Sequence, residues 1–122
     1  MAIVAYVLPV LPGKSERVLR TSQEIAAHRA DYEELNRRAA VRRHLEFLQR
    51  TPRGDLLIAI FESDDLVKLN RAFTDSDYDR WWVARLKDCF GIDASDLAPP
   101  PSPDVVPTWT WESPESDRSS SA

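Results

Sequence analysis

Short apolar runs and one long amphipathic stretch alternate along the first half of the chain. The segment "IVAYVLP" is rich in β-branched and aromatic residues and is followed by Pro12 and Gly13, which predicts a strand over residues 3–8. Apolar residues then recur at heptad spacing, at Val18, Ile25, Tyr32 and Ala39. Because this spacing keeps one stripe of a helix apolar, we expect a single amphipathic helix from residue 14 to about residue 40.

The segment 42–63 predicts a β-hairpin around the turn "TPRGD". Pro52 presets φ for a type I turn, and Gly54 suits the left-handed position that closes a three-residue loop. This turn would place Thr51 opposite Asp55 and so fix the register of both strands. One face would then hold Leu45, Phe47, Leu57, Ala59 and Phe61. The other face would hold Arg42, His44, Glu46, Leu48, Arg50, Leu56, Ile58, Ile60 and Glu62.

Two further helices are expected after the hairpin. The first begins with acidic residues and runs to Phe73. The second follows Ser76, which has capping-box spacing to Asp79, and it ends near Gly91, a plausible C-cap. The resulting order, βαββα with or without a final strand, is that of a ferredoxin-like α+β sandwich.

The composition changes after Leu97 and divides the chain in two. Residues 1–97 predict one folded domain, whereas residues 98–122 are rich in proline and serine and carry four acidic residues against one arginine. Within this extension Trp109 and Trp111 alternate with threonines, which is typical of a short strand. We expect this segment to dock on its own subunit or on a partner. The alternative is a solvated tail with exposed indoles.

The overall composition argues against several classes of protein. The chain has 122 residues, of which 43% are hydrophobic and 30% charged, so it is long enough for one domain with one core. The net charge of −4 argues against a nucleic-acid binder, and the longest apolar run, residues 56–61, is too short to span a bilayer. The first residues contain no basic region and no cleavage site, and the single cysteine, Cys89, has no internal disulfide partner. We therefore expect a cytoplasmic protein without a signal peptide.

The segments "IVAYVLPVLPGK", "EFLQRTPRGDLLIAIFE" and "SDYDRWW" resemble small bacterial proteins of the dimeric α/β-barrel superfamily. The resemblance covers roughly residues 3–91, and "LQRTPRGDL" and "DRWW" are its most specific parts. It implies two ferredoxin-like sheets that face each other in a homodimer, in which each half encloses a pocket. The superfamily includes cofactor-independent quinol monooxygenases, polyketide cyclases, lactone isomerases and haem-degrading enzymes, so the fold alone does not define a reaction.

The mixed face of the predicted hairpin fits such a pocket. The purely apolar face would pack under the helices, while His44, Glu46, Ile58 and Ile60 would point into the barrel. A small-molecule cavity is mostly apolar and contains a few placed polar groups. We therefore expect these side chains to line a pocket for a small aromatic or polyketide-like compound.

His44 and Glu46 are the candidate catalytic residues. They are two residues apart on one predicted strand, so their side chains point the same way. A carboxylate beside an imidazole orients it as a general base. His44 would be that base, Glu46 its partner, and Arg42 or Arg50 an anion stabiliser, in a monooxygenase or cyclase/isomerase without metal or organic cofactor. The alternative is an Arg–Glu salt bridge at the sheet edge with His44 half exposed.

Aromatic residues and a second histidine complete the set of candidates. Tyr6 would present its hydroxyl to a ligand or fill core volume. Trp81 and Trp82 are about 100° apart on a helix, so one would pack inward and the other would border the cavity mouth or the dimer seam. His28 would be a haem or metal ligand or, more often, an interfacial residue, and His44 is the other residue through which haem could bind. A non-catalytic ligand-binding or accessory protein and a haem-binding or haem-degrading protein therefore remain alternatives. Two histidines without a cysteine pair do not predict a structural zinc site.

Overall fold

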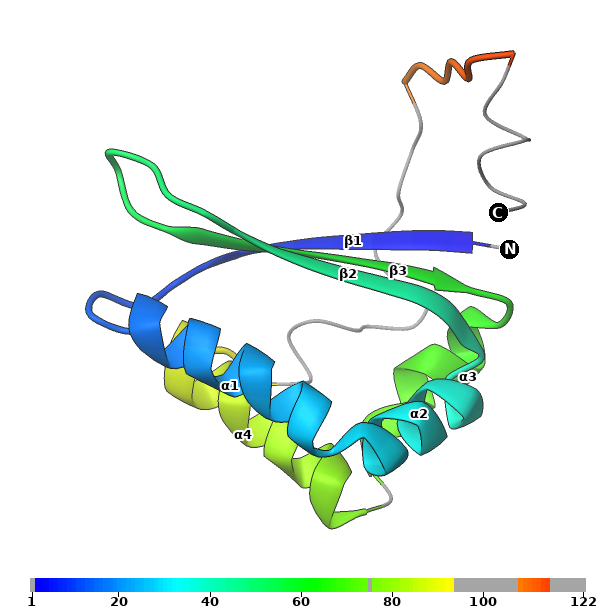
Figure 1. Cartoon of the computed structure of the whole chain (residues 1–122), viewed down its shortest axis with the longest axis horizontal. Coiled ribbons are helices and arrows are strands. Elements are labelled where there is room, and N and C mark those ends of the chain that lie inside the picture. The colour runs from blue at the N-terminus through cyan, green and yellow to red at the C-terminus, as the bar shows by residue number, and fades with distance from the viewer. Residues whose placement is uncertain (1, 75, 94–107, 115–122) are drawn as a thin grey trace.

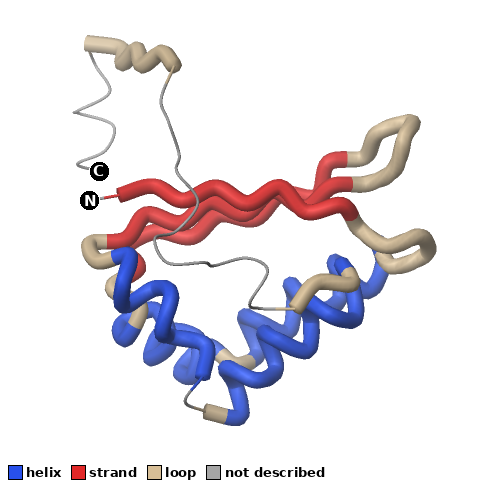
Figure 2. The backbone as a smooth tube through the Cα atoms, turned by 180° about the vertical axis from the view of Figure 1, so that it is seen from behind, coloured by secondary structure: helices blue, strands red, loops and turns tan. Residues whose placement is uncertain are grey.

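The computed structural model describes residues 2–74, 76–93 and 108–114. The strands of the described part form one antiparallel sheet in the order β1-β3-β2 and comprise β1 (Ala2–Pro9), β2 (Val41–Gln49) and β3 (Leu56–Ser63). The helices are α1 (Ser15–Ala27), α2 (Arg29–Arg38), α3 (Leu66–Arg71), the 3-10 helix η1 (Ala72–Thr74) and α4 (Asp77–Phe90). They all cover the same face of the sheet (Figures 1 and 2). The α+β class is confirmed, and the topology is compatible with a ferredoxin-like fold.

The single long helix that we predicted is instead two helices that meet at His28. This residue has φ −113° and ψ 43°, and α2 starts again from its carbonyl, which accepts the amide of Tyr32 over 2.9 Å. The two helices serve two parts of the core. Val18 of α1 packs with Leu8, Leu57, Cys89 and Phe90, and Leu35 of α2 packs with Val4, Ala39, Leu69, Ala72 and Trp82. The chain contains no proline or glycine at the break, so its sequence carries no breaker signal.

The ends of α4 form as the sequence predicts. The Ser76 hydroxyl accepts the Asp79 amide over 3.1 Å, and the Asp79 carboxylate accepts the Ser76 amide over 3.2 Å, which completes a capping box. Gly91 ends the helix in the left-handed conformation with φ 67°. Asp79 is also fully buried and binds Arg38 through two hydrogen bonds of 3.0 and 2.8 Å, so α4 is tied to the end of α2.

The hairpin is confirmed, but its turn is one residue shorter than we predicted. The Gly54 amide donates to the Thr51 carbonyl over 3.1 Å, so Pro52 and Arg53 form a two-residue turn. The Thr51 hydroxyl accepts the Arg53 amide over 3.2 Å and donates to the Gly54 carbonyl, and these bonds stabilise the tighter turn. Gly54 keeps a positive φ of 128°, but Thr51 does not face Asp55.

The shorter turn moves the side chains of the first arm to the opposite face. His44 pairs with Phe61 and Glu46 with Ala59, so both candidate catalytic residues lie on the face that the helices cover. The prediction that they share a face with Ile58 and Ile60 is therefore wrong. A shift of one residue in register exchanges the two faces of a strand, which explains the size of the error.

The other face of the sheet is mostly apolar, with Glu62, Arg43 and Gln49 near its ends, and it carries several exposed side chains. The alternation of the strands places on it Ile3, Ala5, Val7, Leu45, Phe47, Leu56, Ile58 and Ile60. Ile3, Val7 and Phe47 are 50%, 58% and 52% exposed. We call this set of eight residues the open face.

The described piece of the C-terminal extension shows no docked strand. Residues 108–114 form neither helix nor strand, and Trp109 and Trp111 are 82% and 71% exposed. Docking within one subunit is therefore not observed for this piece, and the other residues of 98–122 lie outside the described part. Among the described helices, none has the length and apolar character needed to cross a membrane.

Candidate functional site

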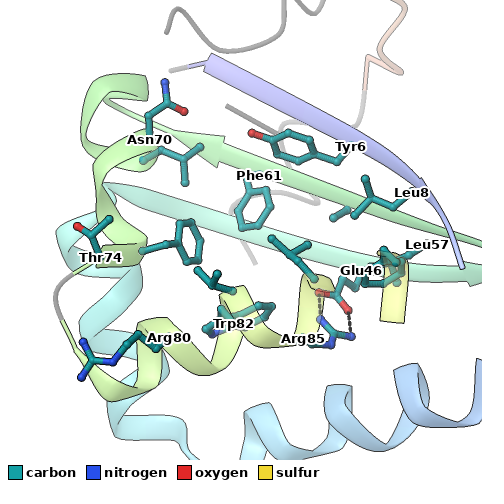
Figure 3. Close-up of a pocket in the computed structure, with 16 residues that line it drawn as sticks. Tyr6, Leu8, Glu46, Leu57, Phe61, Asn70, Thr74, Arg80, Trp82 and Arg85 are labelled. Atoms are coloured by element: carbon teal, nitrogen blue, oxygen red, sulfur yellow. Dashed lines mark hydrogen bonds and ion pairs between the residues drawn. The ribbon is translucent and has the colours of Figure 1, made fainter. Parts of the chain in front are cut away.

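A cavity of about 550 Å³ lies between the covered face of the sheet and the helices α3 and α4 (Figure 3). Aromatic side chains supply much of its wall, namely Tyr6, Phe61, Phe73, Trp82 and Phe90. Its volume is within the range of about 300–1,000 Å³ that small-molecule pockets occupy. We call this space the main cavity.

The strands build the floor of the main cavity around a small residue. Ala59 on the central strand β3 is the register partner of both Tyr6 on β1 and Glu46 on β2. Its methyl group leaves open the space that a larger side chain would fill. Burial raises the pKa of Tyr6, so its hydroxyl stays protonated at neutral pH and can donate a hydrogen bond.

Glu46 and Arg85 form a buried ion pair in the cavity wall. Arg85 Nη1 donates to Glu46 Oε2 and Nη2 to Oε1, each over 3.1 Å, and the two side chains are only 3% and 13% exposed. Arg85 Nε also donates to Thr21 Oγ1 over 2.7 Å, and Nη2 donates to Ser22 Oγ over 2.9 Å. The guanidinium lies 5.4 Å from the ring centre of Trp82, within cation–π distance. These contacts compensate the loss of water around both charges.

The environment keeps Glu46 ionised. Burial alone would raise the pKa of this carboxyl group, but hydrogen bonds from His44 and Arg85 and the charge of Arg85 together lower its pKa to about 2. Glu46 is therefore a carboxylate across the physiological pH range. As a base of such low pKa, it is a poor acceptor of a proton from a substrate.

His44 lies behind Glu46 in a closely packed setting. Its Nδ1 is 2.7 Å from the Tyr32 hydroxyl, its Nε2 is 3.5 Å from Glu46 Oε2, and its ring stacks on Phe61 with centroids 4.3 Å apart. Burial raises the pKa of Tyr32, so its hydroxyl is protonated at neutral pH. Because ionised Glu46 only accepts, we assign the histidine proton to Nε2, which leaves Nδ1 to accept from Tyr32.

A second, smaller cavity of about 390 Å³ lies on the other side of Glu46. Its wall includes Ser22, Ile25, Arg29, Tyr32, His44 and Glu46. Glu46 lines both cavities, whereas His44 lines the smaller one and is not part of the main cavity wall. The sequence correctly paired His44 with Glu46, but only Glu46 of the two lines the main cavity.

The structure does not bring the other hairpin candidates to this site. Arg42 is an exposed residue 3.7 Å from Asp64, and Arg50 is an exposed residue 3.7 Å from Glu16. Neither arginine lines the two cavities. Ile58 and Ile60 belong to the open face, across the sheet from Glu46.

The two tryptophans have different surroundings, but the inward-packed one, rather than its neighbour, lines the cavity. Trp82 is buried and lines the main cavity, whereas Trp81 is half-buried, is absent from the main cavity wall and stacks on Tyr78 at a centroid distance of 5.7 Å. Tyr6 lines the main cavity. The side chain of His28 is 58% exposed, lies 3.8 Å from Asp31 and lines neither cavity.

Arg85 is the site residue that sequence reasoning missed. It follows Trp82 by three positions and precedes Cys89 by four, so it falls on the apolar stripe of α4. An arginine on a buried stripe needs a buried acid. This spacing was the available signal, and Glu46 is the acid that the structure supplies.

The described residues contain no group of three or more His, Cys, Asp or Glu side chains that could hold a metal ion. Comparisons with protein-family models, with curated proteins and with solved structures found no match. The function is therefore argued from the geometry of this site.

Proposed function

We propose that the protein binds a small aromatic or polyketide-like molecule in the main cavity. The observation that carries this proposal is an aromatic cavity with one buried ion pair, Glu46–Arg85, in its wall. Ligand sites are commonly apolar spaces in which a few polar groups orient the ligand. Phe61 and Trp82 offer flat surfaces against which a planar molecule can pack.

The size of the main cavity supports a ligand site over a packing defect. Protein interiors are packed about as densely as organic crystals, and voids larger than a water molecule are few. A space of about 550 Å³ exceeds such a void many times over, and this one is partly open to solvent, so a ligand can enter it. A ligand bound there gains dispersion contacts with the side chains around it.

Filling the floor of the main cavity is expected to abolish binding. Ala59→Leu adds an isopropyl group between Tyr6 and Glu46, so it occupies the space that a ring would take. Calorimetric titration with 2-naphthol and with larger hydroxylated polycyclic aromatics should give saturable binding to the wild type, with a Kd on the order of micromolar. Ala84→Leu, at an exposed position of α4 that lines neither cavity, is the control and should bind normally. Equal binding by both variants, or no binding by the wild type, would contradict the proposal.

Catalysis without metal or organic cofactor is the second candidate, as a monooxygenase or a cyclase/isomerase. The contact series Tyr32, His44 and Glu46, which ends in the wall of the main cavity, favours it. A proton from a bound compound would have to pass Glu46, whose pKa is about 2, to reach the imidazole. This barrier makes binding the better-supported function.

Product analysis of a bound compound distinguishes the two candidates. If the protein is an enzyme, the wild type consumes the compound and His44→Ala binds it without turnover. Recovery of the compound unchanged from the wild type indicates a non-catalytic binding or accessory protein. Haem binding, the remaining alternative, would give a Soret band on titration. No contact of His28 favours it, because that residue lies outside both cavities, and His44 lines only the smaller cavity.

We also propose that two copies of the chain pair through their open faces and so form the barrel that the family resemblance implies. The support is the exposure of Ile3 and Val7 on β1 and of Phe47 on β2. These two strands flank β3, and the three side chains lie on the same face of the sheet. Contiguous apolar surface of this kind marks an interaction site in most soluble proteins.

A further inference from the structure

The charges in the wall of the main cavity cancel each other. Glu46, Arg80 and Arg85 are its lining residues that carry a charge at neutral pH. Arg80 pairs with Asp77 outside the cavity, its side chain is 66% exposed, and it points away from the other labelled residues in Figure 3. The buried charges are therefore one carboxylate and one guanidinium, which form a pair with no net charge.

The pair still has hydrogen-bonding capacity for a ligand. Arg85 Nη1 carries two hydrogens, and Glu46 Oε2 is its one acceptor among the described residues. Arg85 Nε is occupied by Thr21, and Nη2 by Ser22 and Glu46. Glu46 accepts from Ser22 Oγ over 3.2 Å and from both Arg85 nitrogens, and it faces His44 Nε2 at 3.5 Å, so its acceptor sites are taken within the protein. The open capacity of the pair is the second hydrogen of Arg85 Nη1, to which a ligand oxygen can bind as an acceptor.

We propose that the Glu46–Arg85 pair makes the main cavity select uncharged, hydrogen-bonding aromatic ligands over the corresponding carboxylates, with Glu46 as the residue that determines this specificity. The inference rests on the proposed binding function. A carboxylate that enters the main cavity loses its hydration, which is costly unless a free positive charge replaces it. The charge of Arg85 is already compensated by Glu46, and the carboxylate of Glu46 repels the carboxylate of the ligand. An amide or a phenol avoids both penalties.

A matched pair of ligands tests the inference on the unmodified protein. The probes are 2-naphthamide and 2-naphthoate, which share one ring system and nearly one shape but differ in charge. Calorimetry at neutral pH should show that 2-naphthamide binds at least about tenfold more tightly than 2-naphthoate, which corresponds to about 1.4 kcal/mol.

Removal of the Glu46 charge should reverse this preference. Glu46→Gln keeps the size of the side chain and frees the positive charge of Arg85, so 2-naphthoate should bind the variant more tightly than 2-naphthamide. Glu62→Gln is the control, because Glu62 lies across the sheet, opposite Ile3 and Arg43, and has no contact with the pair. This control should keep the wild-type preference.

The two possible failures are distinguishable. If the wild type binds 2-naphthoate as tightly as 2-naphthamide, the selectivity is wrong while the proposed binding function stands. If the wild type binds neither probe, the proposed function and this inference fall together. Because the comparison of probes uses the wild type, it remains decisive even if Glu46→Gln does not fold.

Discussion

Arg85→Met is expected to lower the free energy of unfolding by about 3–5 kcal/mol at neutral pH, the cost of breaking a buried ion pair from one side. The substitution keeps a long apolar stem beside Trp82 but removes both hydrogen bonds to Glu46. Glu46, whose side chain is only 13% exposed, would then carry a buried charge without the guanidinium. Urea denaturation monitored by circular dichroism measures the loss.

The effect of Arg85→Met should depend on pH with a defined sign. In the wild type the pKa of Glu46 is lowered from 4.5 to about 2. A lowered pKa contributes stability above the unfolded value, and this contribution, about 3 kcal/mol, is lost as the pH falls from about 4.5 toward 2. Without Arg85, burial would raise the pKa of Glu46, so protonation at low pH would relieve the variant. The difference in stability between the two proteins should therefore shrink in acid.

Two controls separate the buried pair from a general loss of charge. Arg17→Met breaks ion pairing with Asp88, but Arg17 is 51% exposed, so the expected cost is much smaller than that of Arg85→Met. The double variant Glu46→Gln/Arg85→Met should be more stable than Arg85→Met alone, because no buried charge remains. A pH-independent loss in Arg85→Met, equal to that in Arg17→Met, would show that the pair does not stabilise the fold.

Local sequence signals predicted the elements whose ends are fixed by local contacts. Ser76, Asp79 and Gly91 define α4 through bonds that span a few residues, and the structure forms them. The break at His28 has no such signal. Val18 of α1 and Leu35 of α2 belong to different clusters of the core, and those clusters contain residues distant in sequence, such as Cys89 and Trp82. Heptad spacing predicts one continuous apolar stripe, and it contains no information on which core cluster each residue joins.

Of the candidate site, the sequence predicted that His44 and Glu46 lie together but misplaced the face on which they lie. The pairing of His44 with Glu46 follows from strand alternation and does not depend on register, and the two side chains lie 3.5 Å apart in the structure. The facing of both residues depended on whether Gly54 or Asp55 pairs with Thr51, and the side-chain bonds of Thr51 decide this question. Arg85 lies 39 residues from Glu46, and its role emerges only when α4 folds over the sheet.

Val7→Asp is expected to convert a homodimer into a monomer. Val7 is 58% exposed on β1, and its neighbours on the open face are apolar. If two sheets face each other there, the new carboxylate is buried without a partner, at a cost of several kcal/mol. A loss of about 3 kcal/mol weakens the dimer roughly a hundredfold. Light scattering after gel filtration, at micromolar protein, measures the mass directly.

The chain offers a closely matched control for Val7→Asp. Val67 is 57% exposed, but it lies on α3 in the helical layer, away from the open face. Val67→Asp adds the same charge at the same degree of exposure, so any effect of net charge or solubility should appear equally in both variants. Because the open face is spared, Val67→Asp should remain dimeric at concentrations where Val7→Asp is a monomer. A monomeric wild type, or a Val7→Asp protein that is still dimeric, would refute pairing through the sheet, and the eight apolar side chains of the open face would then need a different partner.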